Sequence, residues 1–241
     1  MKCSIIIPTL NEASNIVTSL TPLQSLREQG HEVIVVDGGS EDNTVMLARP
    51  WVNQVIRSEP GRAQQMQLGA DQATGDVLLF LHADTQLPDN AIELIQTGLA
   101  KTERFLWGRF DVELSGSHWL LGLTATLMNR RSRLTGIATG DQVIFVKRHC
   151  FQQVGGFSLL PLMEDVDLCK RLKQYSRPFC ISTPVVTSSR RWEQNGIIRT
   201  ILLMWSLRLA FFLGISPKVL VTIYYPEAKK NNDSSSNYID G

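Results

Sequence analysis

Three groups of polar and acidic side chains stand where buried β-strands are predicted to end. Pro8-Thr9-Leu10-Asn11-Glu12 follows the first apolar run, Asp37-Gly38-Gly39-Ser40 follows the second, and His82-Ala83-Asp84 follows a later one. In the first group, backbone N–H groups with the Asn11 and Glu12 side chains suit a polar ligand. Each group alone is also typical of a turn or a helix cap. Their convergence on one sheet edge favours a ligand site.

The chemistry of these groups suits a nucleotide and a metal ion. A carboxylate such as Asp37 accepts hydrogen bonds from a base N–H or a ribose hydroxyl, and Gly38 lets the backbone approach a ligand closely. Asp84 is a hard oxygen ligand, suited to Mg²⁺ or Mn²⁺ bridging a diphosphate.

A fourth acidic group, Glu164-Asp165-Val166-Asp167-Leu168, opens a predicted helix. The helix dipole stabilises acidic residues in a first turn, which is the simple structural explanation. The functional explanation is a general base, because a carboxylate beside a second one can have its pKa raised.

Arginines are the candidate phosphate contacts, since a guanidinium matches phosphate geometry. Arg62 begins a predicted helix, where the dipole disfavours a free cation, so its position asks for an anionic partner. Weaker candidates are Arg109, Arg130, Arg131, Arg133, Arg190 and Arg191.

Apolar runs and helical periodicity alternate through residues 1–100. Continuously apolar strands are predicted at 4–8, 32–36, 54–57 and 77–81, as in a parallel sheet buried on both faces. Pro22 should break the first intervening helix. This order predicts right-handed βαβ units and an α/β doubly wound sheet, which binds ligands at the carboxyl ends of its strands.

The second half is mixed. It has predicted strands at 105–114 and 142–146, and predicted helices at 119–128, 164–174 and 197–213. We expect one domain over 1–228, with a nucleotide-binding half (1–100) and an acceptor half (101–228), followed by a flexible tail (229–241).

Charge and cysteine content exclude some classes of protein. Lys and Arg number 24 against 23 Asp and Glu, giving a net charge of +1, and this argues against a nucleic-acid binder. The four cysteines form no CxxC pair, so a structural zinc site is not expected. Cys3 and Cys180 lie in apolar, strand-like runs, and a reducing cytoplasm fits this pattern best.

The apolar stretch 197–213 allows several interpretations. Arg199 and Arg208 interrupt it, and a membrane span needs about 20 apolar residues. The pattern favours a core or homodimer helix first, then an interfacial helix giving peripheral contact with the inner face of a membrane, and a spanning helix last.

These motifs together resemble family 2 glycosyltransferases. Residues 5–12 and 35–44 are similar to the family's opening segment, His82-Ala83-Asp84 to its DxD-type element, and 164–168 to its ED motif. The segments 61–66 and 140–142 resemble a bacterial subgroup, some members of which are linked to arsenosugar biosynthesis. His82 stands where the first Asp of the DxD element is common.

The resemblance implies a GT-A fold, a nucleoside-diphosphate sugar donor, a divalent metal and inversion at the anomeric carbon. By position, Pro8, Thr9, Glu12 and Asp37 would hold the nucleoside, Asp84 would ligate Mg²⁺ or Mn²⁺, and Asp165 would be the base. Arg190-Arg191-Trp192 is similar to part of a motif of processive synthases, but its glutamine-led form is absent, so transfer of one sugar to a hydroxyl is expected.

Two other functions stay open. A polyprenyl-phosphate glycosyltransferase would use the same residues with a lipid acceptor at the membrane surface. A non-catalytic nucleotide-sugar-binding protein would keep Asp37 and Asp84 without needing Asp165. The sugar, the nucleotide and a small-molecule or lipid acceptor are left open by the sequence.

Overall fold

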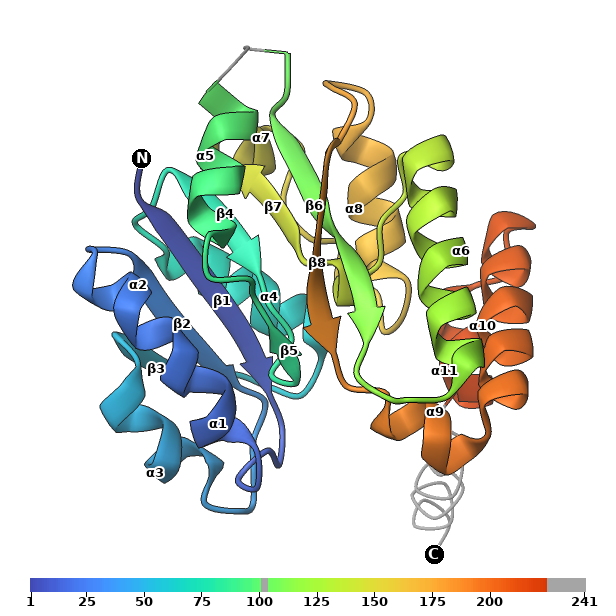
Figure 1. Ribbon diagram of the computed structural model, residues 1–241, viewed down its shortest axis with the longest axis horizontal. Helices are drawn as coiled ribbons and strands as arrows, with labels where there is room; N and C mark the ends of the chain where they lie inside the picture. Colours follow the sequence, from blue (N-terminus) through green and yellow to red (C-terminus); the bar gives the residue numbers. More distant parts are fainter. Residues whose placement is uncertain (101–103, 225–241) are drawn as a thin grey trace, which may run out of the picture.

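The computed structural model describes residues 1–100 and 104–224. Its centre is an eight-stranded sheet with the spatial order β3-β2-β1-β4-β7-β6-β8-β5 (Figure 1). The strands are β1 (Cys3–Thr9), β2 (Glu32–Asp37), β3 (Gln54–Arg57), β4 (Val77–Phe80), β5 (Thr85–Gln86), β6 (Trp107–Leu114), β7 (Ile144–Lys147) and β8 (Phe179–Thr187). The tail predicted at 229–241 lies outside the described residues.

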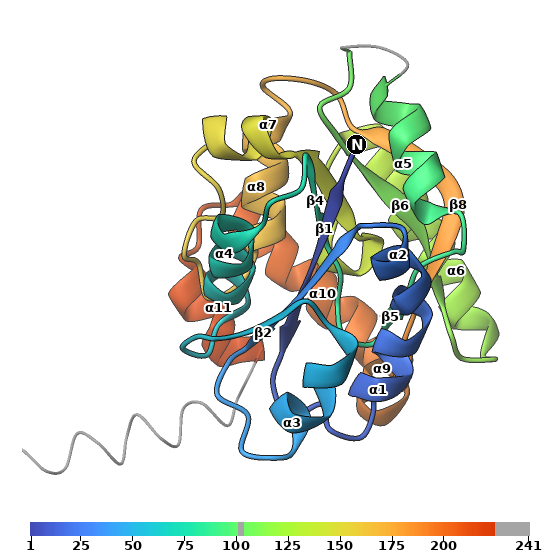
Figure 2. The ribbon, with the colours of Figure 1, turned by 90° about the vertical axis from the view of Figure 1, so that its left-hand side faces the viewer.

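Helices cover both faces of this sheet. They are α1 (Ile16–Leu20), α2 (Gln24–Glu28), α3 (Thr44–Ala48), α4 (Arg62–Gln72), α5 (Ala91–Ala100), α6 (Trp119–Thr135), α7 (Arg148–Gln153), α8 (Glu164–Leu172), α9 (Arg190–Asn195), α10 (Ile197–Phe212) and α11 (Pro217–Tyr224). Figure 2 shows α4, α7 and α8 on one side of the sheet, with α1, α2 and α5 on the other.

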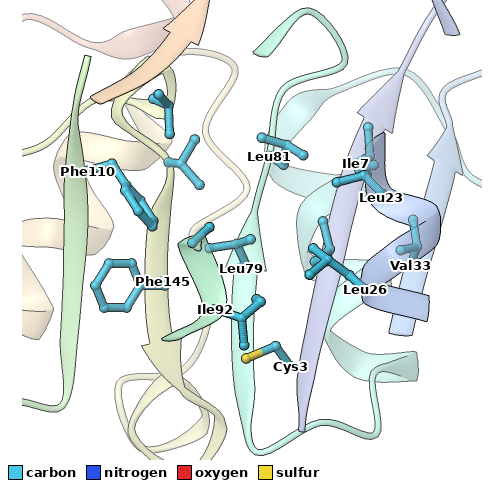
Figure 3. Packing of buried hydrophobic residues seen from close by; sticks show 14 of the residues in the cluster. Cys3, Ile7, Leu23, Leu26, Val33, Leu79, Leu81, Ile92, Phe110 and Phe145 are labelled. Atoms are coloured by element: carbon cyan, nitrogen blue, oxygen red, sulfur yellow. The ribbon is translucent and has the colours of Figure 1, made fainter. Parts of the chain in front are cut away.

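The continuous apolar character of the first strands follows from this two-sided burial. Successive side chains of a strand point to opposite faces. Ile5 and Ile7 belong to one buried cluster with Leu20 and Leu23, and Ile6 belongs to a second cluster with Met66 on the other face. Figure 3 shows Ile7 and Leu23 of the first cluster. The predicted α/β fold and its parallel first half are therefore confirmed, since β1 pairs in parallel with both β2 and β4.

The helix after β1 is divided where the sequence predicted. Pro22 lies in a 3₁₀ turn, Thr21–Leu23, between α1 and α2, and this turn replaces the α-helical hydrogen bonding that proline cannot support. Gly30 follows with a φ of +88°, a conformation that glycine adopts readily, and the chain turns into β2.

The second half introduces antiparallel pairing. β7 runs antiparallel to β4 and to β6, whereas β6 and β8 are parallel. The β6–β8 register shifts between Phe110 and Asp111, opposite the stretch of β8 that carries Pro184. Proline is tolerated at such irregularities because it cannot donate to the ladder. The sheet is thus mixed on this side, as expected.

The C-terminal helices pack against α8 and α6. Leu207 of α10 and Leu220 of α11 form a buried cluster with Met163 and Val166 beside α8. α11 was not among the predicted helices, although Pro217 at its first position is a common helix start. Among residues 1–100 and 104–224, no helix is both long and apolar enough to cross a bilayer.

Candidate functional site

A cleft lies at the carboxyl ends of β1 and β4. It has two adjoining chambers, with cavity volumes of about 300 and 160 Å³. Pro8, Thr9 and Glu12 line the first chamber, and Asp165 lines the second. Both chambers are lined by Arg62, His82, Asp84, Leu162 and Glu164. The cleft therefore brings together most of the residues selected from the sequence.

The first chamber is shaped by a buried glutamine between two strand ends. The Gln65 side-chain amide donates to the carbonyl oxygens of Thr9 and Val36, each at 2.8 Å. The Thr9 carbonyl also accepts from the Gly38 N–H at 2.9 Å, so Gln65 adds a side-chain link where β1 and β2 end. Gln65 thereby fixes the relative position of Thr9 and Asp37, which are register partners.

Asp37 lies beneath the surface, not on the cleft wall. Its side chain is 1% exposed, and it is not among the residues lining either chamber. Its Oδ2 accepts from the backbone N–H groups of Gly39 (3.1 Å) and Ser40 (3.0 Å). Its Oδ1 is buried without a hydrogen-bond partner in the described structure. A buried carboxylate oxygen without a donor is costly, so this atom is suited to a ligand N–H.

Two of the selected residues have structural roles in this loop. Asn11 adopts a φ of +54°, and its side-chain oxygen accepts from the Glu41 N–H at 2.9 Å. It therefore joins the loop after β1 to the loop after β2, outside the chamber walls. At Gly38, a Cβ atom would lie 3.0 Å from the Gln65 amide, so the glycine makes room for Gln65.

Asp84 is exposed at the junction of the two chambers. Beside it, His82 Nδ1 lies 3.3 Å from Asp141 Oδ1. Burial by itself would raise the pKa of Asp141. The hydrogen bond and charge of His82, with the charges of Arg62 and Arg208, instead hold that pKa below its usual range. His82 thus pairs with a neighbouring carboxylate.

Asp165 is held by two backbone N–H groups at the start of α8. Its Oδ2 accepts from the Gly140 N–H at 2.8 Å, and its Oδ1 accepts from the Val166 N–H at 2.7 Å. The residue before α8, Met163, has a φ of +68° and turns the chain so that Glu164 and Asp165 enter the cleft. The carboxylate is thus oriented from two sides, with lone pairs remaining for a ligand.

Glu164 differs in protonation from the usual carboxyl group. It is 8% exposed, and burial followed by the negative charge of Asp165 raises its pKa to about 7. The raised pKa expected from paired carboxylates is therefore found at Glu164. Near neutral pH this group exchanges a proton readily inside the cleft.

The arginines fall into separate groups. Arg62 lines both chambers, as its position at the start of α4 suggested. Arg109 and Arg133 both pair with Asp111 and are not among the cleft-lining residues. Arg130 and Arg131 lie on α6 and line a neighbouring groove. The side chain of Arg191 lies outside the described structure, and Arg190 is exposed.

Four functional candidates were not selected from the sequence. Gln65, Gly140 and Asp141 support the chamber walls, and Arg208 lines the second chamber. The charge of Arg208 faces Asp165 and Asp141. An arginine inside an apolar helix was the available signal for Arg208, because such a charge needs a polar partner.

The residues at Asp84 fit a divalent cation. Among the described residues, no cluster of three or more His, Cys, Asp or Glu side chains is arranged to hold a metal unaided. Mg²⁺ commonly binds through one or two carboxylates plus substrate phosphates, and an exposed carboxylate at the chamber junction provides that kind of ligand. The donor set is hard oxygen, which suits Mg²⁺ or Mn²⁺.

Comparison with known proteins identifies the family. The family model described as "Glycosyl transferase family 2" matches residues 4–153, which include β1 without its first residue, β2 to β7 and the whole of α7. This chain belongs to glycosyltransferase family 2. The match contains the strand ends that carry Thr9, Asp37 and Asp84. It ends before Asp165.

Relatives extend the similarity to the rest of the chain. The "PGL/p-HBAD biosynthesis glycosyltransferase" of Mycobacterium bovis is 36% identical over 242 residues, covering 93% of this chain and 91% of that protein. The "Undecaprenyl-phosphate 4-deoxy-4-formamido-L-arabinose transferase" of Yersinia pestis is 30% identical over 102 residues, covering 38% of this chain and 31% of that protein. The chain thus spans about a third of the length of the Yersinia relative.

A solved structure confirms the GT-A type of fold. The mannosyltransferase PcManGT from Pyrobaculum calidifontis, in complex with GDP-Man and Mn²⁺, superposes with a TM-score of 0.60 at 19% identity. The superposition covers 78% of this chain and 56% of that one. The protein is therefore a family 2 glycosyltransferase with the predicted fold, and its neighbour holds a nucleotide sugar and a metal ion.

Proposed function

We propose that this protein transfers one sugar from a nucleoside-diphosphate sugar to a hydroxyl acceptor, with inversion and with a divalent metal. The observation that carries the proposal is the shared cleft of Asp84 and Asp165. A metal ligand and an oriented carboxylate on one cavity are the two groups that such a transfer needs.

The first chamber is the proposed site of the nucleoside. Pro8, Thr9 and Glu12 would form its walls. The unpartnered Oδ1 of Asp37 would accept a hydrogen bond from an N–H or hydroxyl group of the nucleoside. The diphosphate would lie at the junction, where Arg62 supplies positive charge. Asp84 would hold Mg²⁺ or Mn²⁺ there, and the bound cation would stabilise the negative charge of the leaving diphosphate.

The second chamber is the proposed site of the reaction. Asp165 would accept the proton of the acceptor hydroxyl as that oxygen attacks the anomeric carbon, and the bond to the diphosphate breaks. The two N–H groups that bind Asp165 limit its rotation, so one lone-pair direction is kept toward the acceptor. A base on one side of the sugar and the leaving group on the other would give inversion.

Asp165→Asn tests the role of the base. The substitution keeps the size of the side chain and one acceptor oxygen but removes the proton acceptor, so donor binding should persist while transfer falls by about 10²-fold or more. Donor binding is measured by calorimetry and transfer by release of the nucleoside diphosphate.

Asp89→Asn provides the control, because it removes one exposed carboxylate in the segment before α5, and Asp89 is not among the residues lining the cleft. Normal turnover by Asp165→Asn would show that another group is the base.

A lipid phosphate acceptor is the second candidate. The named activity of the Yersinia relative supports it, as does an apolar groove beside the second chamber. A phosphate oxygen is already anionic and needs no base. Asp165→Asn would then retain most of its activity with a lipid phosphate and lose it with a hydroxyl acceptor.

A further inference from the structure

An apolar groove lies beside the proposed reaction site. α6 and α10 run side by side (Figure 1), and between them the groove has a volume of about 610 Å³. Its apolar lining includes Leu127, Met128, Ile201 and Trp205. This volume is within the ~300–1,000 Å³ typical of ligand pockets. The groove is thus large enough for an extended apolar group.

The groove continues into the second chamber of the cleft. Trp192, Met204 and Arg208 line both cavities. A molecule lying between α6 and α10 would therefore reach the chamber that contains Asp165.

Buried guanidinium groups stand at this inner end. Arg131 lines the groove, and its Nε and Nη2 atoms are buried without a hydrogen-bond partner in the described structure. Burial, followed by the positive charge of Arg208, lowers the pKa of Arg131 to about 10. The two cations therefore repel one another, and the carboxylate of Asp165 offsets this only in part. Buried guanidinium N–H groups without a hydrogen-bond partner, next to a second positive charge, favour the binding of an anionic group.

We infer that this groove binds the acceptor as an amphipathic molecule, with an apolar chain between α6 and α10 and an anionic group held by Arg131 and Arg208 beside Asp165. The inference rests on the proposed function and deepens its second candidate, the lipid phosphate acceptor. A membrane surface would cover the outward side of α10 but would not reach the buried donors of Arg131. A second copy packed through apolar contacts alone would also leave those donors unsatisfied.

Three probes separate the two parts of the inference. Dodecyl phosphate carries the chain and the anion, dodecyl maltoside the same chain with an uncharged head, and butyl phosphate the anion with a short chain. Binding is followed by tryptophan fluorescence, to which Trp192 and Trp205 contribute. The full-length protein should bind dodecyl phosphate at least about tenfold more tightly than it binds dodecyl maltoside or butyl phosphate.

Two variants and their controls locate the binding. Leu127→Asp places a charge in the groove and should weaken dodecyl phosphate binding about tenfold or more. Arg131→Met should abolish the preference for dodecyl phosphate over dodecyl maltoside. Two substitutions at exposed residues are the controls: Met46→Asp in α3, and Arg49→Met directly after α3. Neither should weaken dodecyl phosphate binding or change the preference for it over dodecyl maltoside.

The outcomes distinguish the two proposals. Failure of wild-type protein to bind any nucleotide sugar with Mn²⁺ would reject the proposed function. Normal nucleotide-sugar binding with equal affinity for the three probes would reject the acceptor site alone. So would a wild-type dimer that Leu127→Asp converts to a monomer without changing probe binding, since the groove would then be an interface between copies. The probe comparison needs only wild-type protein, so it stands if a variant fails to fold.

Discussion

The two adjacent carboxyl groups at the start of α8 differ because their surroundings differ. Asp165 accepts hydrogen bonds from two backbone N–H groups, which hold its carboxylate in one orientation. Glu164 is buried against that negative charge, and its pKa is raised to about 7. Asp165 is thereby oriented toward the cleft, and the neighbouring Glu164 exchanges a proton near neutral pH.

Glu164→Gln should change the dependence of stability on pH. Because the folded state holds the Glu164 proton more tightly than the unfolded chain does, stability is highest below the unfolded pKa of about 4.5 and is lost as pH rises toward 7. The loss is on the order of 3 kcal/mol. The glutamine variant avoids it, so its melting temperature should exceed that of the wild type at pH 8, with a much smaller difference at pH 5.

Thermal unfolding at the two pH values measures this effect. Glu93→Gln, in the first turn of α5 and outside the cleft-lining set, gives the matched control. An equal difference between wild type and Glu164→Gln at pH 5 and pH 8 would mean that Glu164 ionises normally.

At the scale of elements, the position of α4 determines both chambers. Arg62 lies at its start, Gln65 joins the ends of β1 and β2, and Gly69 lets the helix approach the sheet. A Cβ atom at Gly69 would lie 2.5 Å from Ile6 Cγ2 and 2.9 Å from Val36 Cγ2. Close packing at this glycine therefore positions residues of the cleft one to two turns away.

Gly69→Ala should destabilise the protein by about 1–3 kcal/mol, because the extra methyl group forces α4 away from β1 and β2. Gly122→Ala is the control, because a Cβ atom at this position would have no neighbouring atom within 4 Å. The substitution also replaces a glycine inside α6 by a better helix former. That change should be neutral or stabilising by up to about 1 kcal/mol. Chemical denaturation measures both, and equal stabilities for the two variants would contradict the close approach of α4.

At the scale of the molecule, the cleft joins the two halves of the sheet. Asp84 follows β4 and Asp165 lies in the first turn of α8, so a ligand that contacts both connects segments far apart in the sequence. A ligand that binds only the folded state stabilises it by mass action. Folding stability therefore reports directly on donor binding.

A nucleotide sugar with Mn²⁺ should raise the melting temperature. At a hundredfold excess over its Kd, a ligand adds about 2.7 kcal/mol. A thermal-shift screen of UDP- and GDP-sugars measures the effect, which EDTA should remove. Asp84→Asn should lose the dependence on metal while Asp89→Asn keeps it. A shift that EDTA leaves unchanged would exclude a metal from donor binding.

Local sequence patterns determined most elements of the first half of the chain and most of the cleft. Strands with apolar side chains on both faces had to be covered by helices on both sides of the sheet. The carboxyl ends of parallel strands had to meet at one edge, which brought Thr9 and Asp84 to one cavity. The family 2 resemblance drawn from those motifs is confirmed. The roles of the single residues, the single-domain boundaries and the narrower subgroup remain predictions.

Only the tertiary structure decided the contacts between distant segments. The hydrogen bond from Gly140 to Asp165 and the pairing of His82 with Asp141 connect residues that no local sequence period relates. The burial of Asp37 likewise depends on segments distant in the sequence. The groove between α6 and α10 likewise depends on how two amphipathic helices pack. Periodicity tells which face of a segment is buried. It does not tell against which partner, because many partners satisfy the same hydrophobic requirement.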